Sequence, residues 1–125
     1  MRLIDTSIAV DHLRGVAAAT ELLSGLIQSG EPIAASELVR FELLAGVQEG
    51  ELETLEQFFS ALSWVSIDAH ISEVGGLLAR RYRRSHSGID DADYLIAATA
   101  LVLDVGLVTT NLRHFPMLPG LESPY

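Results

Sequence analysis

The chain has 125 residues, with 17 acidic and eight basic side chains, and therefore a formal net charge of −9. It contains no cysteine and no lysine, so every basic side chain is an arginine. These absences exclude a disulfide scaffold, a zinc finger and a thiolate metal site. They also exclude Schiff-base chemistry and the lysine of a phosphate-binding P-loop.

The composition predicts one globular domain over residues 1–125. Hydrophobic residues make up 49% and charged residues 20% of the chain, which is typical of a folded protein. No apolar run reaches the roughly 18 residues of a membrane span, and no signal-peptide pattern opens the chain, so we expect a cytoplasmic protein without membrane contact. The net negative charge by itself argues against a nucleic-acid binder, and favours metal binding, a basic partner or solubility.

The first part of the chain predicts two short strands and two helices. Leu3 and Ile4, followed by Asp5, indicate a buried strand that ends at an acid. A helix over 6–13 follows, and leucines at helical spacing predict another over 16–29. Residues 32–35 are a candidate second strand.

The same alternation continues to the end of the chain. We expect helices over 36–48, capped by Ser36, and over 51–62, a strand over 64–67, and a helix from Asp68 or Ser72 to about residue 84. A helix over 91–103, ended by Gly106, then precedes a strand over 107–110. Strands that alternate with helices predict an α/β fold with a mainly parallel sheet.

Polar residues follow two of the predicted strands, in places where ligands bind. In parallel sheets, ligands bind beyond the carboxyl ends of the strands, where Asp5 and Asn111 lie. The alternative for Asp5 is a helix cap. On a helical wheel of about 100° per residue, Glu42 falls among apolar and small neighbours. A carboxylate there is paired with a core arginine, protonated or bound to a metal, whereas Glu37 suits a solvated pair with Arg40.

Three further acids open the predicted helix over 91–103. Two acids are enough for a favourable interaction with the helix dipole, and three repel one another unless a cation is near. Asp93 shares a face with small alanines and is the preferred ligand, with Asp90 as a capping or auxiliary acid. Asp91 points to the far side, to solvent or a nearby arginine. Carboxylates on separate elements without clustered His or Cys suit Mg²⁺, or Mn²⁺ as a substitute, and such ions support phosphodiester hydrolysis.

Four segments, in this order, resemble the PIN-domain ribonucleases, and most closely the VapC toxins of VapBC toxin–antitoxin pairs. They are Leu-Ile-Asp-Thr-Ser at residue 3, Glu-Leu-Leu-Ala-Gly at 42, Asp-Tyr-Leu-Ile-Ala-Ala-Thr-Ala at 93 and Leu-Val-Thr-Thr-Asn-Leu-Arg-His-Phe at 107. The resemblance implies a three-layer α/β/α sandwich and a magnesium-dependent endoribonuclease that inhibits translation and growth. It also implies a structured RNA substrate such as transfer or ribosomal RNA, a homodimer, and a VapB-like antitoxin whose tail occupies the active-site groove. The predicted helices over 16–29 and 51–62 offer apolar faces for a dimer.

The same resemblance assigns roles to individual residues. Asp5, Glu42 and Asp93 match the three acidic catalytic and metal-binding positions, and Asn111 stands at a fourth position that is aspartate in many PIN domains. Hydroxyl groups that would hold ligands or waters by hydrogen bonds belong to Thr6, Ser7 and Thr110. His114 is interpreted as a structural histidine beside Phe115, the alternative being a contact with substrate.

Half of the basic residues lie in one run, Arg80, Arg81, Arg83 and Arg84, around Tyr82. They either complement a helix C-terminus or form an RNA-binding rim, with Tyr82 stacking on a base. Two other functions stay open: a metal-dependent phosphohydrolase of a small molecule, and a non-catalytic acidic groove that captures a basic peptide.

Overall fold

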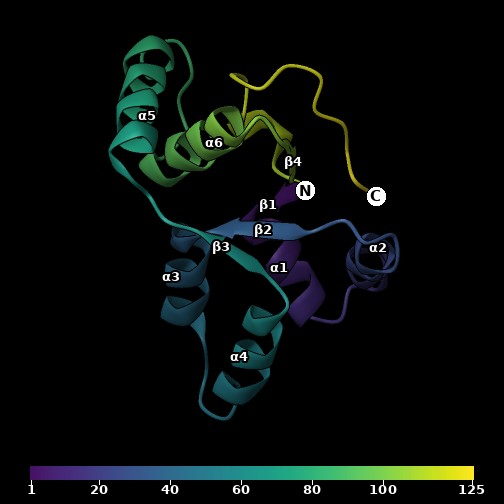
Figure 1. The fold of residues 1–125 in the computed structure, drawn as a ribbon. Helices are drawn as coiled ribbons and strands as arrows, with labels where there is room; N and C mark the ends of the chain where they lie inside the picture. Colours follow the sequence, from purple (N-terminus) through teal and green to yellow (C-terminus); the bar gives the residue numbers. More distant parts are fainter.

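The computed structural model describes residues 1–125 and contains one parallel sheet between helices (Figure 1). The sheet has four strands, which are β1 (Arg2–Ile4), β2 (Ile33–Ser36), β3 (Ser63–Val65) and β4 (Gly106–Val108). Their order is β3-β2-β1-β4, and all neighbouring pairs are parallel. The predicted parallel α/β architecture is therefore confirmed.

Six α-helices connect the strands: α1 (Thr6–Leu13), α2 (Ala17–Gln28), α3 (Glu37–Gly46), α4 (Leu52–Ser60), α5 (Ala69–Tyr82) and α6 (Asp91–Leu103). A short 3-10 helix, η1 (Leu112–His114), follows β4. No helix combines the length and apolar character that a membrane crossing would require.

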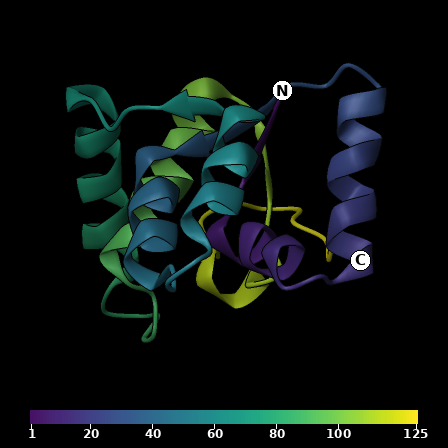
Figure 2. The same cartoon turned by 90° about the horizontal axis from the view of Figure 1, so that it is seen from below.

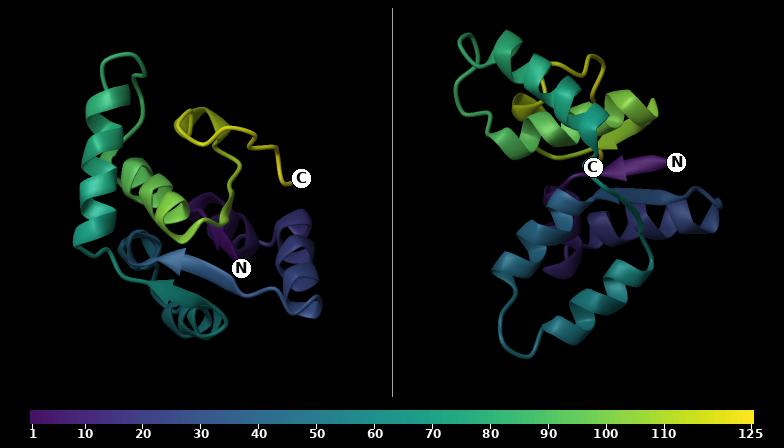
Figure 3. Two further views of the ribbon diagram at one scale, coloured as in Figure 1. Left: turned by 45° about the horizontal axis from the view of Figure 1, so that its top comes forward. Right: turned by 60° about the vertical axis from the view of Figure 1, so that its left-hand side comes forward.

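The handedness of the connections explains the three layers. The chain moves from β1 through β2 to β3 in one direction across the sheet, then returns past β1 to β4. Because parallel crossovers are right-handed, this reversal sends the two sets of helices to opposite faces. Figures 1 and 3 show α5 and α6 on one side of the strands, and α1, α3 and α4 on the other, as predicted for an α/β/α sandwich.

Local capping explains where three helices begin. The Ser36 hydroxyl accepts a hydrogen bond from the Leu38 amide at 3.2 Å, which starts α3 as predicted. Asp68 starts α5 in the same way. At α6, the side chains of Asp90 and Asp93 accept hydrogen bonds from each other's backbone amides, in a capping box.

Several predicted boundaries were wrong by a few residues. The helix predicted over 36–48 ends at Gly46, and the strand predicted over 64–67 lies one to two residues earlier. Gly106 does not end α6 but begins β4, since Asp104 ends the helix in a left-handed conformation with φ 53°. The strand predicted over 107–110 ends at Val108.

The core extends over both faces of the sheet and includes the C-terminal tail. Twenty-four buried apolar residues form one cluster, to which Phe115 and Met117 of the tail contribute. At the end of the chain, the Tyr125 hydroxyl donates a hydrogen bond to Asp11 of α1 at 2.6 Å. Figure 2 shows the C-terminus beside α2. The tail thus ties the region after β4 to α1, which begins directly after β1.

Candidate functional site

The reversal of the chain past β1 places a binding site between β1 and β4. Ligands of open parallel sheets bind where neighbouring connections leave in opposite directions. Asp5 follows β1 directly, and its amide donates to the Val108 carbonyl at 2.9 Å. Since Ile4 pairs with Val108, Asp5 and Thr109 are the first residues beyond two adjacent strand ends.

Two hydroxyl groups hold the Asp5 carboxylate. Asp5 is only 4% exposed, and its Oδ2 accepts hydrogen bonds from Thr109 at 2.7 Å and from Ser7 at 3.2 Å. Asp5 stands at the N-cap position of α1, but its side chain caps no helix amide. Its carboxylate is therefore oriented toward the sheet edge, and the cap interpretation does not describe it.

Thr109 is a site residue that the sequence analysis missed. Residue 110 was expected to supply the hydroxyl, but the Thr110 side chain is exposed and only its amide reaches Ser7, at 3.2 Å. The buried Thr109 instead donates to Asp5 and accepts from the Asn111 amide at 3.0 Å. The register of the two strands identifies this residue. Ile4 pairs with Val108, so Asp5 and Thr109 each follow a paired residue directly and lie side by side.

Glu42 reaches the same region from α3, on the other side of β1. Its Oε1 accepts a hydrogen bond from the Thr6 hydroxyl at 3.2 Å. Partial burial raises the pKa of Glu42, as do the charges of Asp5 and Asp90, whereas the Thr6 hydrogen bond lowers it. The charges of two acids, one directly after β1 and one at the start of α6, therefore act on this carboxylate of α3.

The apolar neighbours predicted around Glu42 do not bury it. Among the residues that flank it on the wheel, Val39 is buried and Leu38 half-buried, but Ala45 and Gly46 are exposed, as is Glu42 itself. Glu42 therefore lies at the border between the covered and the exposed sides of α3. The alternative of a core arginine partner also fails, because Arg40 pairs with Glu37, as predicted for that acid.

Asp93 lies at the start of α6, where the capping box fixes its carboxylate. It is 8% exposed, and its Oδ2 lies 3.1 Å from Nδ1 of His114. Burial raises the pKa of Asp93 to about 6; the charges of Asp90 and Asp5 raise it as well, whereas the hydrogen bond from the Asp90 backbone and the charge of His114 lower it. A cation would relieve this repulsion.

His114 and Asn111 differ from their predicted arrangement. The imidazole of His114 contacts the carboxylate of Asp93, a partner that the sequence analysis did not predict. Asn111 precedes η1, its side chain is exposed, and only its backbone amide joins the network, through Thr109. The contacts of His114 and Asn111 depend on how the chain after β4 folds back toward α6, which local sequence patterns do not show.

The donors at this edge fit a hard cation. Apart from one imidazole, all of them are carboxylate or hydroxyl oxygens. Mg²⁺ and Mn²⁺ prefer such oxygen ligands, whereas zinc sites are rich in Cys and His. No three acidic or imidazole side chains lie close enough together to hold an ion by themselves. Mg²⁺ sites commonly use one or two carboxylates, with waters and substrate phosphate as the other ligands.

An open groove leads away from Glu42. It has a volume of about 460 Å³ and lies between α1, α3 and α4. Its walls combine apolar side chains with acids and one arginine, including Val10, Leu43, Val47, Leu55, Glu51 and Arg14. The Glu42 side chain is therefore shared between the acidic region and the lining of this groove.

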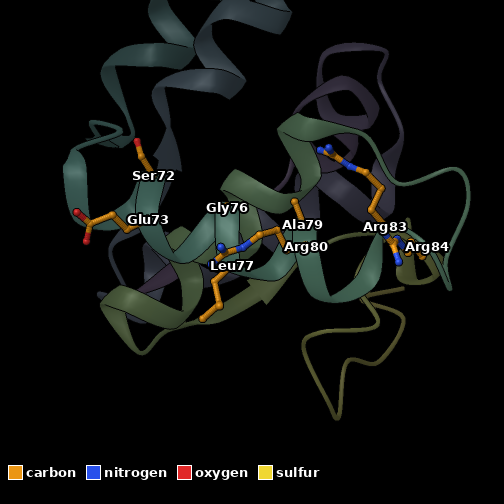
Figure 4. Close-up of a pocket in the computed structure, with 8 residues that line it drawn as sticks. All are labelled: Ser72, Glu73, Gly76, Leu77, Ala79, Arg80, Arg83 and Arg84. Carbon is orange, nitrogen blue, oxygen red and sulfur yellow. The ribbon is translucent and has the colours of Figure 1, made fainter.

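The arginine run divides into groups with different contacts. Arg83 donates to Asp91 at 2.6 Å, so the predicted pairing of Asp91 with an arginine is confirmed. Arg80, Arg83 and Arg84 line a groove on the outer side of α5, which Arg81 does not line (Figure 4). Three of the four arginines of the predicted rim thus line one groove.

Comparisons with known proteins agree with this geometry. The family model described as PIN domain matches residues 2–119. The chain is 67% identical to the Mycobacterium tuberculosis protein named Ribonuclease VapC19, over the full length of both chains. It is 38% identical to Ribonuclease VapC10 of the same organism, over all of this chain and 93% of that one.

Solved structures show the same fold. A toxin–antitoxin complex from Klebsiella pneumoniae matches with a TM-score of 0.82 and 26% identity, covering 100% of this chain and 98% of that chain. VapBC2 from Rickettsia felis, bound to a DNA fragment from its promoter, matches with the same score and identity over 96% and 94%. The family model, the relatives and the sheet-edge acids lead to one conclusion: this chain belongs to the PIN-domain family and is similar to its VapC toxins.

Proposed function

We propose that this protein is a metal-dependent endoribonuclease that acts as the toxin of a type II toxin–antitoxin pair. The observation that carries the proposal is the acidic site of Asp5, Glu42 and Asp93 at the carboxyl edge of β1, in a chain that resembles named ribonucleases along its whole length. Its reaction is the hydrolysis of RNA phosphodiester bonds in the cytoplasm, with inhibition of translation and growth as the result.

Magnesium is the proposed cofactor, with manganese as a substitute. Asp5 and Asp93 are buried, and hydrogen bonds orient their carboxylates, so they are the principal ligands, and Glu42 completes the acidic set. When bound, the ion supplies a more acidic water and neutralises charge on the phosphoryl oxygens. Asn111 in place of a fourth aspartate limits the negative charge available to a second ion.

Several side chains of the protein hold the acidic groups in position, and one can accept a proton. Thr109 and Ser7 fix the Asp5 carboxylate, and His114 together with the capping box fixes Asp93. Thr6 occupies Oε1 of Glu42, which leaves Oε2 available to accept a proton from the attacking water. The raised pKa of Glu42 makes its carboxylate a stronger base than that of an ordinary glutamate, which favours this role.

The proposed substrate is structured RNA of the transfer or ribosomal type.

The test is to map RNA 5′ ends after induced expression of the wild type and of Asp93→Ala, followed by in vitro cleavage with and without chelator. Asp5→Ala and Asp93→Ala should abolish cleavage, while Glu53→Gln, on the exposed face of α4, should leave it intact. Normal cleavage by either Asp variant would refute the site assignment. Parallel incubation with small phosphate esters separates a nuclease from a small-molecule phosphohydrolase.

The proposed inhibitor is a VapB-like antitoxin that occupies the groove beside Glu42. An antitoxin tail with apolar side chains and an arginine or lysine suits the mixed walls and the terminal carboxylates. Co-purification with the product of a neighbouring small gene, and loss of nuclease activity in the complex, tests this. Unchanged RNA cleavage by the purified complex would contradict it.

A homodimer is proposed for the free toxin. Apolar side chains on several helices are exposed, among them Ile27 of α2 (58%), Phe41 of α3 (67%) and Leu52 of α4 (47%). Unpartnered apolar surface of this kind marks protein interfaces. Light scattering with size-exclusion chromatography should give twice the chain mass of 13.5 kDa.

A further inference from the structure

A groove on the outer side of α5 is separate from both the acidic site and the groove beside Glu42. Figure 4 shows its lining, with Ser72 and Glu73 at one end, Arg83 and Arg84 at the other, and Leu77 and Arg80 between them. Its volume is about 890 Å³. The hollow exists because small residues, Ser72, Gly76 and Ala79, follow one another at helical spacing between longer side chains.

This groove concentrates positive charge on a protein whose net charge is −9. Three of the eight arginines line it, against one acid, Glu73. Arg80 and Arg84 are exposed and form no salt bridge in the structure, so their guanidinium groups are free for a ligand. Only Arg83 has a partner, the exposed Asp91.

The arginine end of the groove adjoins the start of α6. The Arg83–Asp91 pair joins the last residues after α5 to the first turn of α6, two residues before Asp93. The arginine end of the groove is thus linked to the same first turn of α6 that carries Asp93.

We propose that this arginine groove binds the phosphate backbone of the RNA substrate, at nucleotides flanking the bond that is cut. The inference deepens the proposed nuclease function and rests on it. Guanidinium groups bind phosphates in a bidentate manner and hold their charge at every physiological pH. The groove would thus supply the basic contacts that the acidic bulk of the protein lacks.

The lining favours the backbone over bases or peptides. It includes no aromatic side chain, so it offers no stacking platform. Tyr82, expected to stack on a base, is half-buried against the core, with its ring centroid 5.5 Å from that of His86. Leu77 and Ala79 are the only apolar residues of the groove, too few to anchor a helical peptide. Phosphate contacts position RNA without reading its sequence.

The test measures binding and catalysis separately in the full-length protein. Fluorescently labelled bulk transfer RNA is titrated in chelator, where cleavage cannot occur, against Arg80→Gln and Arg84→Gln. Arg81→Gln is the matched control, since it removes the same charge from the same helix outside the groove. We expect each groove variant to raise Kd about three- to tenfold and to lower the salt slope of binding by roughly 0.7–1, and the control to raise Kd less than about twofold.

A gain of affinity is the second measurement. Glu73→Gln removes the one carboxylate of the groove and should tighten RNA binding about two- to threefold, whereas Glu53→Gln on α4 should not. With magnesium and saturating RNA, kcat of Arg80→Gln, Arg84→Gln, Arg81→Gln and Glu73→Gln should stay within about twofold of wild type, with the change confined to KM.

The outcomes separate this inference from the proposed function. Equal effects of Arg80→Gln, Arg84→Gln and Arg81→Gln overturn the groove assignment. So does preferential binding of polyglutamate over RNA with the same variant dependence, since the groove would then take an acidic protein. If the wild type cleaves no RNA with magnesium yet binds it through these arginines, the nuclease proposal fails while the groove assignment stands.

Discussion

At the scale of single residues, the hydroxyl of Thr109 has the most specific task. It is buried, donates to Asp5 at 2.7 Å and accepts from the Asn111 amide at 3.0 Å. Removing it leaves a buried carboxylate with one hydroxyl donor instead of two. We predict that Thr109→Val lowers nuclease activity about 10- to 100-fold, the usual cost of losing a group that orients a metal ligand.

The measurement is cleavage rate against magnesium concentration. Thr109→Ser keeps the donor and should restore most of the activity. Thr110→Val changes an exposed side chain that forms no hydrogen bond with Asp5 or Asp93. This variant should therefore cleave RNA at the wild-type rate. Equal losses at positions 109 and 110 would show that the hydroxyl of Thr109 has no special role.

Asp93 gives a residue-level prediction about pH. Its pKa in the folded protein is raised to about 6 from 3.8, so the folded state binds the proton more tightly than the unfolded state. A carboxyl group whose pKa is higher in the folded state stabilises the fold at low pH, where it is protonated. This contribution is lost as the pH rises from about 4 through 6. In chelator near pH 7.5, Asp93→Asn should therefore raise Tm by roughly 2–5 °C, a modest rise because solvent screens part of the repulsion.

The pH dependence of this Tm difference is the check. Near pH 4.5 most wild-type molecules carry a protonated Asp93, so the advantage of asparagine should shrink. The amide oxygen still accepts the capping hydrogen bond from Asp90, which keeps the helix start intact. An Asp93→Asn protein that is less stable than wild type at both pH values would contradict the prediction.

At the scale of elements, two adjacent glycines in α5 offer a matched comparison. A Cβ on Gly75 would lie 2.9 Å from Cδ2 of Leu95 in α6, whereas one on Gly76 would meet nothing within 4 Å. Alanine favours a helix interior over glycine by about 0.5–1 kcal/mol. We predict that Gly76→Ala gains this amount in free energy of unfolding. Gly75→Ala should gain no stability, because the Leu95 side chain must move to make room for the new methyl group. Urea unfolding of both variants measures the two free energies. Equal gains would show that the contact with Leu95 has no energetic cost.

Local sequence signals predicted the elements better than their relations. The helix Asp91–Leu103 was placed correctly because its acids and cap residue lie next to one another in the sequence. Glu42 and Thr109 could not be placed in this way. The exposure of Glu42 depends on which side of α3 the sheet covers, and the role of Thr109 on the register between β1 and β4. Both are relations between segments far apart in the chain.

At the scale of the whole molecule, charge is unevenly distributed. The net charge of −9 includes four acids near one sheet edge, Asp5, Glu42, Asp90 and Asp93, and their mutual repulsion raises the pKa of Glu42 and of Asp93. Three arginines gather in the separate groove on α5. Bulk charge thus argued against an RNA-binding protein, while the positions of the charges allow a cation at one place and phosphates at another.

Because the acidic edge joins β1, α3 and α6, a bound cation should stabilise the entire fold. A ligand that binds only the folded state at about 100 times its Kd contributes about 2.7 kcal/mol, enough to raise Tm by several degrees. We predict such a rise for the wild type on adding magnesium, and little or none for Asp93→Asn. Asp91→Asn is the control from the same helix turn: its carboxylate is exposed and pairs with Arg83, so its magnesium response should equal that of the wild type. If Asp91→Asn loses the response as fully as Asp93→Asn, magnesium acts through general screening of acidic charge, and the sheet edge holds no specific ion.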